Sequence, residues 1–198
     1  MRPFVIGVDE AGRAPLAGPV SVGVVRVPEG FDVAREFPGV KDSKKLSPDK
    51  REEIYRLLLK RQESGDVQFC VRFSDHLYID SFGITRAVRR AVWSGVKFLA
   101  PDPALARVQL DGLLQAPCAY AQETIVHGDD LVPLISLASV VAKVRRDRLM
   151  RRLSRTYPEY YFELHKGYGT QTHWDAINMH GLCDIHRRTY CNVDAPPQ

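Results

Sequence analysis

Acidic side chains follow three β-rich runs of the sequence. These acids are Asp9 and Glu10 after PFVIGV, Asp111 after VQL, and Asp129 and Asp130 after ETIVHG. A core strand has little reason to end in acids, and carboxylate oxygens are hard ligands that suit Mg²⁺ or Mn²⁺. Converging carboxylates repel one another unless cations lie between them. The pattern therefore predicts a metal site, in which two ions could promote hydrolysis of a phosphodiester bond.

The acids also have a simpler interpretation as solvated turn residues. Neighbouring residues of a strand point to opposite faces, so Asp9 and Glu10 converge only where the strand twists or ends. The carboxylates by themselves indicate a metal site and do not identify its substrate.

A glycine-containing turn, Gly12-Arg13-Ala14, directly follows the first pair of acids. Further along the chain, Tyr168 lies between two glycines in KGYGT, so its loop could place an aromatic ring against a ligand. A single tyrosine is more often part of the packing. The loop that carries Tyr168 is therefore a candidate for contact with a ligand.

Basic residues are concentrated in the segment 133–155. They are Lys143, Arg145, Arg146, Arg148, Arg151, Arg152 and Arg155. Such a run usually forms a solvated helix face, but beside a nucleic-acid site we expect part of it to contact phosphate, Arg146 included. Ser139 and Lys143 are one helical turn apart and could face the same nucleic-acid backbone.

The elements that must position these residues follow from hydrophobic periodicity and end signals. Strands are predicted at 3–9, 19–27, 66–73, 107–111 and 122–127. Helices are predicted at 47–62, 78–99, 133–155 and 171–180. Two paired strands followed by alternating helices and strands indicate an α/β layered domain with a mixed sheet.

Length and composition place limits on the class of protein. A chain of 198 residues with 44% hydrophobic residues fits one α/β domain. The net charge of +4 suits a polyanionic partner without requiring one. The four cysteines form no CxxC pair, so we expect free thiols. The apolar run at the N-terminus is too short for a signal peptide and none is long enough to span a membrane, which predicts a cytoplasmic protein.

Several motifs together resemble the type 2 ribonuclease H (ribonuclease HII) family. Besides GVDEAGRA they are KDSKKL (41–46), IDSFGI (79–84), LDG (110–112), GD (128–129), SLASVVAKVRRD (136–147), HKGYGT (165–170) and IHRRTY (185–190). All occur in the family's order and span nearly the whole chain. The resemblance implies a ribonuclease H-like mixed sheet flanked by helices, with additional C-terminal helices. We expect one domain over 1–193, with a catalytic core to about 155, a helical part over 156–193 and a loose tail at 194–198.

The resemblance also implies roles for residues. Asp9, Glu10, Asp111 and Asp129 match the four metal-binding acids of the family, with two Mn²⁺ or Mg²⁺ ions in the active state, and Asp130 becomes a bystander. The turn Gly12-Arg13-Ala14 matches the one that contacts the ribose 2′-hydroxyl through its backbone. Tyr168 matches a tyrosine that packs on the sugar, and Lys44, Ser139, Lys143 and Arg146 are expected substrate contacts.

The implied activity is cleavage of RNA in RNA–DNA hybrids and of DNA duplexes containing ribonucleotides, leaving 5′-phosphate and 3′-hydroxyl ends, by a monomeric enzyme.

One departure is Ala14, where the family carries a second glycine; Pro15 favours an extended backbone at this position, which alanine tolerates. Two rivals stay open, a nuclease of the same fold acting on DNA structures and a non-catalytic nucleic-acid-binding module. In IHRRTY, the interpretation favoured for His186 and Arg187 is that they brace the fold.

Overall fold

A computed structural model describes residues 3–40 and 46–191 of the chain. Its strands are β1 (Phe4–Ala11), β2 (Val20–Pro28), β3 (Gln68–Ser74), β4 (Ala106–Asp111) and β5 (Ala121–Ile125). Its helices are α1 (Val33–Glu36), α2 (Pro48–Glu63), α3 (His76–Phe82), α4 (Ile84–Leu99), α5 (Gly128–Leu131), α6 (Pro133–Leu153), α7 (Phe162–His165) and α8 (Gln171–His180). The predicted α/β class with a mixed sheet is confirmed.

Within these ranges the strands form one sheet in the order β3-β2-β1-β4-β5. The first three strands are antiparallel neighbours, whereas β4 lies parallel to β1 and β5 parallel to β4. The crossover between β1 and β4 runs through β2, β3 and the helices that follow them. Parallel strands direct their carboxyl ends to the same edge of a sheet, so Asp111, the last residue of β4, lies beside the carboxyl-terminal part of β1.

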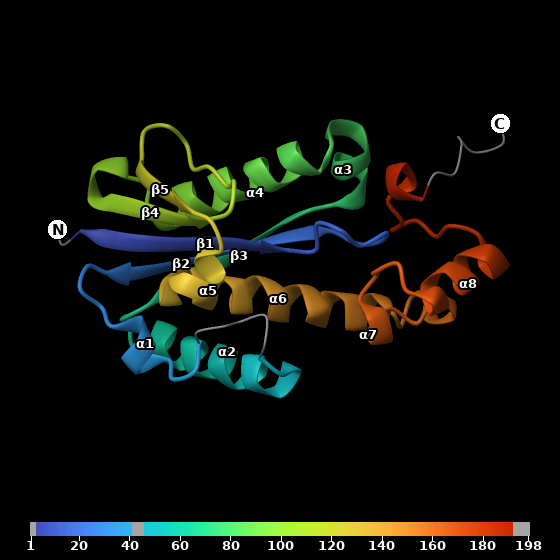
Figure 1. Ribbon diagram of the computed structural model, residues 1–198, viewed down its shortest axis with the longest axis horizontal. Helices are drawn as coiled ribbons and strands as arrows, with labels where there is room; N and C mark the ends of the chain where they lie inside the picture. Colours follow the sequence, from blue (N-terminus) through green and yellow to red (C-terminus); the bar gives the residue numbers. More distant parts are fainter. Residues whose placement is uncertain (1–2, 41–45, 192–198) are drawn as a thin grey trace.

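Helices cover both faces of the sheet (Figure 1). Helix α4 packs on one face with a buried apolar stripe, while α6 packs on the other face with α2 outside it. Glycines allow α6 to approach closely, because a Cβ on Gly7 would lie 2.5 Å from the carbonyl oxygen of Leu134 and one on Gly23 2.2 Å from that of Ala138. The close contact holds α6 against the middle of β1 and against β2.

Two predicted boundaries are wrong. The expected helix at 78–99 is divided into α3 and α4 by Gly83, whose φ of 80° is open to glycine and strained for other residues. The first strand does not end at Asp9, since its pairing with β2 continues through Ala11 and Ser21. The two acids therefore lie inside β1. The N-cap at Ser47 and the stop at Gly181 are confirmed.

The C-terminal helices, α7 and α8, lie beyond the end of the sheet (Figure 1). They pack around a cluster of aromatic and histidine rings. The chain around Leu16 joins this part to the sheet. The amide of Leu16 donates to the carbonyl of Gly167, and the amide of Arg187 donates to the carbonyl of Leu16. The predicted helical part after residue 155 is thus fastened to the loop between β1 and β2. The tail predicted at 194–198 lies outside the described residues.

Candidate active site

The acids of β1 and β4 meet because these two strands are parallel. Val8 pairs with Leu110, so the next residues along the strands, Asp9 and Asp111, lie beside each other at the shared edge. Asp9 is buried on the α6 side of the sheet, whereas Glu10 follows it on the strand and is partly exposed. Despite this alternation, all three acids line the same pocket.

The pocket also contains most of the other predicted site residues. Beside Asp9, Glu10 and Asp111, its walls include Gly12, Arg13, Ala14, Ser139, Lys143 and Tyr168. These residues come from β1 and the turn after it, from β4, from α6 and from the loop before α8. The fold thus brings together segments that are far apart in the sequence, and the nine residues form one continuous surface.

The electrostatics of the acids fit a cation site. Burial and the neighbouring carboxylates of Glu10 and Asp111 raise the pKa of Asp9 well above its ordinary value, against a hydrogen bond from Ser139. Burial also raises the pKa of Glu10, which Arg13 opposes from 3.2 Å. Within the described residues, Glu10 Oε2 is buried without a hydrogen-bond partner. Hard oxygen donors that repel one another in a partly buried pocket are the groups that a divalent cation would stabilise.

Asp129 lies behind this pocket and is not part of its wall. It is fully buried in the first turn of α5, and its amide approaches Asp111 Oδ1 at 3.3 Å. The exposed Asp130 faces away from the buried side of this turn. Among residues 3–40 and 46–191, no three acidic, histidine or cysteine side chains are already gathered at metal-binding distances. A role for Asp129 as a ligand therefore needs the carboxylates to draw together around the ion.

The turn after β1 is held from below by a buried side chain. Gly12 has a φ of 91°, and a Cβ on it would lie 2.0 Å from Nε of Arg146, so only glycine fits here. Arg13 and Ala14 follow with exposed side chains. The backbone of the turn, rather than its side chains, has a fixed position at the pocket.

Tyr168 reaches the pocket from the loop before α8. Its ring is 37% exposed, which is enough to leave a face open to a ligand, and Lys143 Nζ lies 5.5 Å from its centre. The loop that carries it passes close to the first turn, since a Cβ on Gly167 would lie 2.6 Å from the carbonyl oxygen of Ala17. Lys143 also pairs with Asp147 at 2.8 Å. Tyr168 and Lys143 thus form one edge of the pocket.

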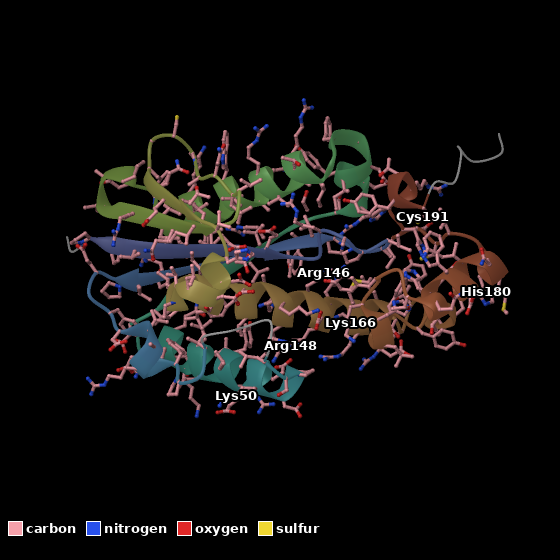
Figure 2. All side chains as sticks on the ribbon, in the orientation of Figure 1. Lys50, Arg146, Arg148, Lys166, His180 and Cys191 are labelled. Carbon is pink, nitrogen blue, oxygen red and sulfur yellow. The ribbon has the colours of Figure 1, made fainter. Side chains whose placement is uncertain are left out.

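The predicted phosphate contact of Arg146 is wrong. Its side chain, labelled in Figure 2, is fully buried. Its three nitrogens donate to the backbone carbonyls of Ala17, Pro19 and Lys166. On other sides of α6, Arg148 forms an ion pair with Glu52 of α2, and Arg145 bonds to the hydroxyl of Tyr55. The run of basic residues therefore winds around the helix and serves several surfaces. Lys44 lies outside the described residues.

Two further arginines, Arg51 and Arg187, lie at or near the pocket. Arg51 of α2 lines the pocket, and nothing in its helical context indicated this. Arg187 is fully buried and its guanidinium binds the carbonyls of Gly12 and Arg13, so the interpretation of Arg187 as a brace is confirmed. His186 is buried too, 3.0 Å from His173 between their Nε2 atoms, and is confirmed in the same role.

A sheet of this order, with helices on both faces and acids at the edge of β1 and β4, defines a nuclease fold of the ribonuclease H type. Comparison with known proteins agrees. The sequence profile described as Ribonuclease HII matches residues 6–193. Ribonuclease HII of Burkholderia lata is 42% identical over 192 residues, which cover 97% of this chain and 85% of that protein. The chain belongs to the ribonuclease HII family.

Solved structures support the fold. The crystal structure of ribonuclease H2 from Pyrococcus horikoshii OT3 superposes with a TM-score of 0.68 at 26% identity, covering 94% of this chain and 93% of that one. Bst-RNase HIII in complex with Mn²⁺ superposes with a TM-score of 0.68 at 19% identity, covering 91% and 63%. The ribonuclease HII family, shown by the sequence matches, is a family of divalent-metal-dependent hydrolases, so the chain is an enzyme of this kind. No helix in the described part of the chain is long and apolar enough to cross a membrane.

Proposed function

We propose that this protein is an endoribonuclease that hydrolyses the RNA strand of RNA–DNA hybrids and nicks DNA duplexes on the 5′ side of embedded ribonucleotides. The products carry 5′-phosphate and 3′-hydroxyl ends. It acts as a monomer in the cytoplasm, in ribonucleotide excision during DNA repair and replication. One observation of the structure supports this function best.

That observation is the shared pocket of the acids and the Gly12-Arg13-Ala14 turn. Acids alone would suit any metal-dependent phosphodiesterase. A fixed stretch of backbone beside them adds hydrogen-bonding groups that can contact a sugar. The ribose 2′-hydroxyl both donates and accepts hydrogen bonds, and it is the group that distinguishes RNA from DNA at such a site. The pairing of the two features favours a ribonuclease over a nuclease of DNA structures.

The four acids would hold two Mg²⁺ or Mn²⁺ ions, with Asp9, Glu10 and Asp111 in the pocket wall and Asp129 behind it. When bound, two such ions activate a water and stabilise the leaving oxygen of the phosphodiester. The chain itself places the carboxylates, since the pairing of β1 with β4 fixes Asp9 against Asp111. No side chain serves as a covalent nucleophile.

The remaining pocket residues would bind the substrate. Tyr168 lines the same pocket as the turn and is partly exposed, and its ring would pack on the sugar of the junction nucleotide. Ser139 and Lys143, one turn apart on α6, would contact the nucleic-acid backbone, and Lys44 would add a phosphate contact. Such contacts with phosphate fix the register of a duplex without reading its sequence. Arg146 takes part only indirectly, by supporting the turn from below.

Cleavage of four labelled duplexes with Mg²⁺ tests the proposal. They are an RNA–DNA hybrid, a DNA duplex with one ribonucleotide, an all-DNA duplex and an all-RNA duplex. We expect cleavage of the first two only, with the nick 5′ of the ribonucleotide. Cleavage of the all-DNA duplex would favour a nuclease of DNA structures. Binding without cleavage of any duplex, with Mg²⁺ or Mn²⁺, would favour a non-catalytic binding module.

A further inference from the structure

The turn that follows β1 is held by a guanidinium from the other end of the chain. Arg187 Nη2 donates to the carbonyl of Gly12 and Nη1 to that of Arg13, both at 2.7 Å, while Nε donates to Gly18 at 3.0 Å. Its own amide donates to the carbonyl of Leu16 at 2.7 Å. The side chain is fully buried. One rigid fork therefore fixes the orientation of two successive peptide groups of the turn.

A second buried guanidinium lies beside the first. Arg146 donates to the carbonyls of Ala17, Pro19 and Lys166 at 2.9–3.1 Å. Burial and the charge of Arg187 lower the pKa of Arg146 to about 10. Among the ion pairs of the described residues, neither arginine has a carboxylate partner. Burying two like charges without acids is costly. The hydrogen bonds to backbone carbonyls offset this cost, since apolar side chains would leave the same carbonyls buried without donors.

The geometry of the peptide group shows what the hydrogen bonds from Arg187 do to the turn. In a trans peptide the C=O and the N–H of the next residue point in opposite directions. Because the carbonyls of Gly12 and Arg13 point into the protein toward Arg187, the amides of Arg13 and Ala14 are directed away from it, on the side of the pocket that these residues line. No described residue accepts a hydrogen bond from either amide. Two donors are thus oriented and left open to a ligand.

We propose that Arg187 is a positioning residue that sets the ribose preference of the site. By holding the Gly12 and Arg13 carbonyls, it aims the amides of Arg13 and Ala14 at the sugar 2′ position, where a hydroxyl accepts hydrogen bonds and a deoxyribose offers no acceptor. This inference rests on the proposed function, because it assumes that the turn contacts the sugar. It assigns the specificity of the turn to a residue 175 positions away in the sequence from Gly12.

Arg187→Lys is the direct test, because lysine keeps the charge but a single nitrogen cannot hold two carbonyls in a fixed fork. The first readout is the ratio of cleavage rates on a duplex with one ribonucleotide and on a long RNA–DNA hybrid. The second, independent of catalysis, is the ratio of affinities for the one-ribonucleotide duplex and the matching all-DNA duplex, measured by fluorescence anisotropy without divalent cations. We expect both ratios to fall about tenfold, the effect of one well-aligned hydrogen bond.

Phe162→Leu is the matched control. Phe162 is fully buried in the same C-terminal cluster and lies outside the pocket, so the variant should lower the melting temperature while leaving both ratios unchanged. If Arg187→Lys lowers the melting temperature and leaves both ratios as in wild type, Arg187 is only a structural brace and the inference is overturned. If wild-type protein shows no preference for ribose at all, the proposed function fails first, and the inference with it.

A measurement on the wild-type protein covers the case in which Arg187→Lys does not fold. The backbone amide resonances of Arg13 and Ala14 should shift when the one-ribonucleotide duplex is added, and shift much less with the all-DNA duplex. Arg187→Gln, which keeps one donor without the charge, serves as the second variant and should lose this difference. Equal shifts with both duplexes in wild-type protein would overturn the inference.

Discussion

Two buried polar clusters of this protein, the acids at β1 and β4 and the histidines of the C-terminal part, show opposite electrostatic designs. Asp9 and Glu10 repel each other and Asp111, and their pKa values are raised. His173 and His186 share a hydrogen bond at 3.0 Å, and burial lowers the pKa of each to about 4. The acids thus need a ligand to relieve their charge, whereas the histidines are neutral and satisfied by the protein.

The comparison shows how burial alone fails to identify a functional site. Both clusters are buried and both shift pKa values, but only the acids lie in a pocket with a free carboxylate oxygen, at Glu10 Oε2 among the described residues. The histidines instead hold neighbouring segments together, since His173 Nδ1 lies 3.0 Å from the carbonyl of Tyr168. Carboxylates that repel one another without a counter-charge indicate a ligand-binding site. Neutral groups whose hydrogen bonds are made within the protein indicate a structural role.

Removing one acid should have the largest effect on activity. Asp9→Asn keeps the shape and removes a charge, so we expect hybrid cleavage with Mg²⁺ to fall by roughly three orders of magnitude or more, because the cation loses a ligand. The free energy of unfolding in metal-free buffer should rise, since repulsion with Glu10 and Asp111 is relieved. Near wild-type cleavage by this variant, in a gel assay at saturating Mg²⁺, would remove Asp9 from the metal site.

Acid should unfold the protein through the histidine cluster. The folded-state pKa of His173 and His186, about 4, lies below the unfolded value of about 6.5, so the unfolded chain binds more protons between these values. The stability from this cluster is full above pH 6.5 and is lost as the pH falls toward 4, by an amount on the order of 3 kcal/mol for each histidine. Urea melts between pH 7 and pH 4.5 measure it.

His173→Gln should flatten this pH dependence, because the glutamine cannot take up a proton. His180→Gln changes an exposed histidine at the end of the same helix and should keep the wild-type slope. Identical slopes for wild type and His173→Gln would contradict the role given to this cluster.

Tyr168 connects the two clusters, because its carbonyl meets His173 and its ring faces the pocket. Tyr168→Ala removes the ring and should cost roughly 1–3 kcal/mol of transition-state stabilisation, by analogy with losses of stacking. The loss should be greater on a duplex with one ribonucleotide than on a long hybrid, which offers many registers. Tyr168→Phe should keep much of the activity. Equal losses on both substrates together with a lower melting temperature would assign Tyr168 to packing alone.

Ala14→Gly should have the smallest effect. It restores the second glycine of the family's turn and removes a methyl group from the pocket wall. If the methyl obstructs the sugar, cleavage at one ribonucleotide should improve relative to the long hybrid. The added backbone freedom should lower the free energy of unfolding by about 1 kcal/mol or less. A large loss of activity would show that the alanine side chain makes a contact of its own with substrate.

The sequence by itself determined the strands, the main helices and the acidic residues that come together in the pocket. Alternating and helical periodicities located the five strands and the main helices within the described residues, and Ser47 and Gly181 fixed two helix ends. Acids at the ends of β-rich runs predicted where carboxylates gather, because parallel strands share an edge. Local signals are enough for such features, since propensity, caps and patterning act over a few residues.

Only the tertiary structure decided which side chains of each element line the pocket and which are buried in the packing. Lys143 and Arg146 lie three residues apart on α6, but Lys143 lines the pocket whereas Arg146 is buried under Gly12. No rule of spacing separates them, because the outcome depends on what packs against the helix. Likewise Arg51 reaches the pocket only because α2 lies on the outside of α6, and Arg187 meets the turn at Gly12 only because the chain returns there. Contacts between distant segments depend on the whole packing, and periodicity does not record them.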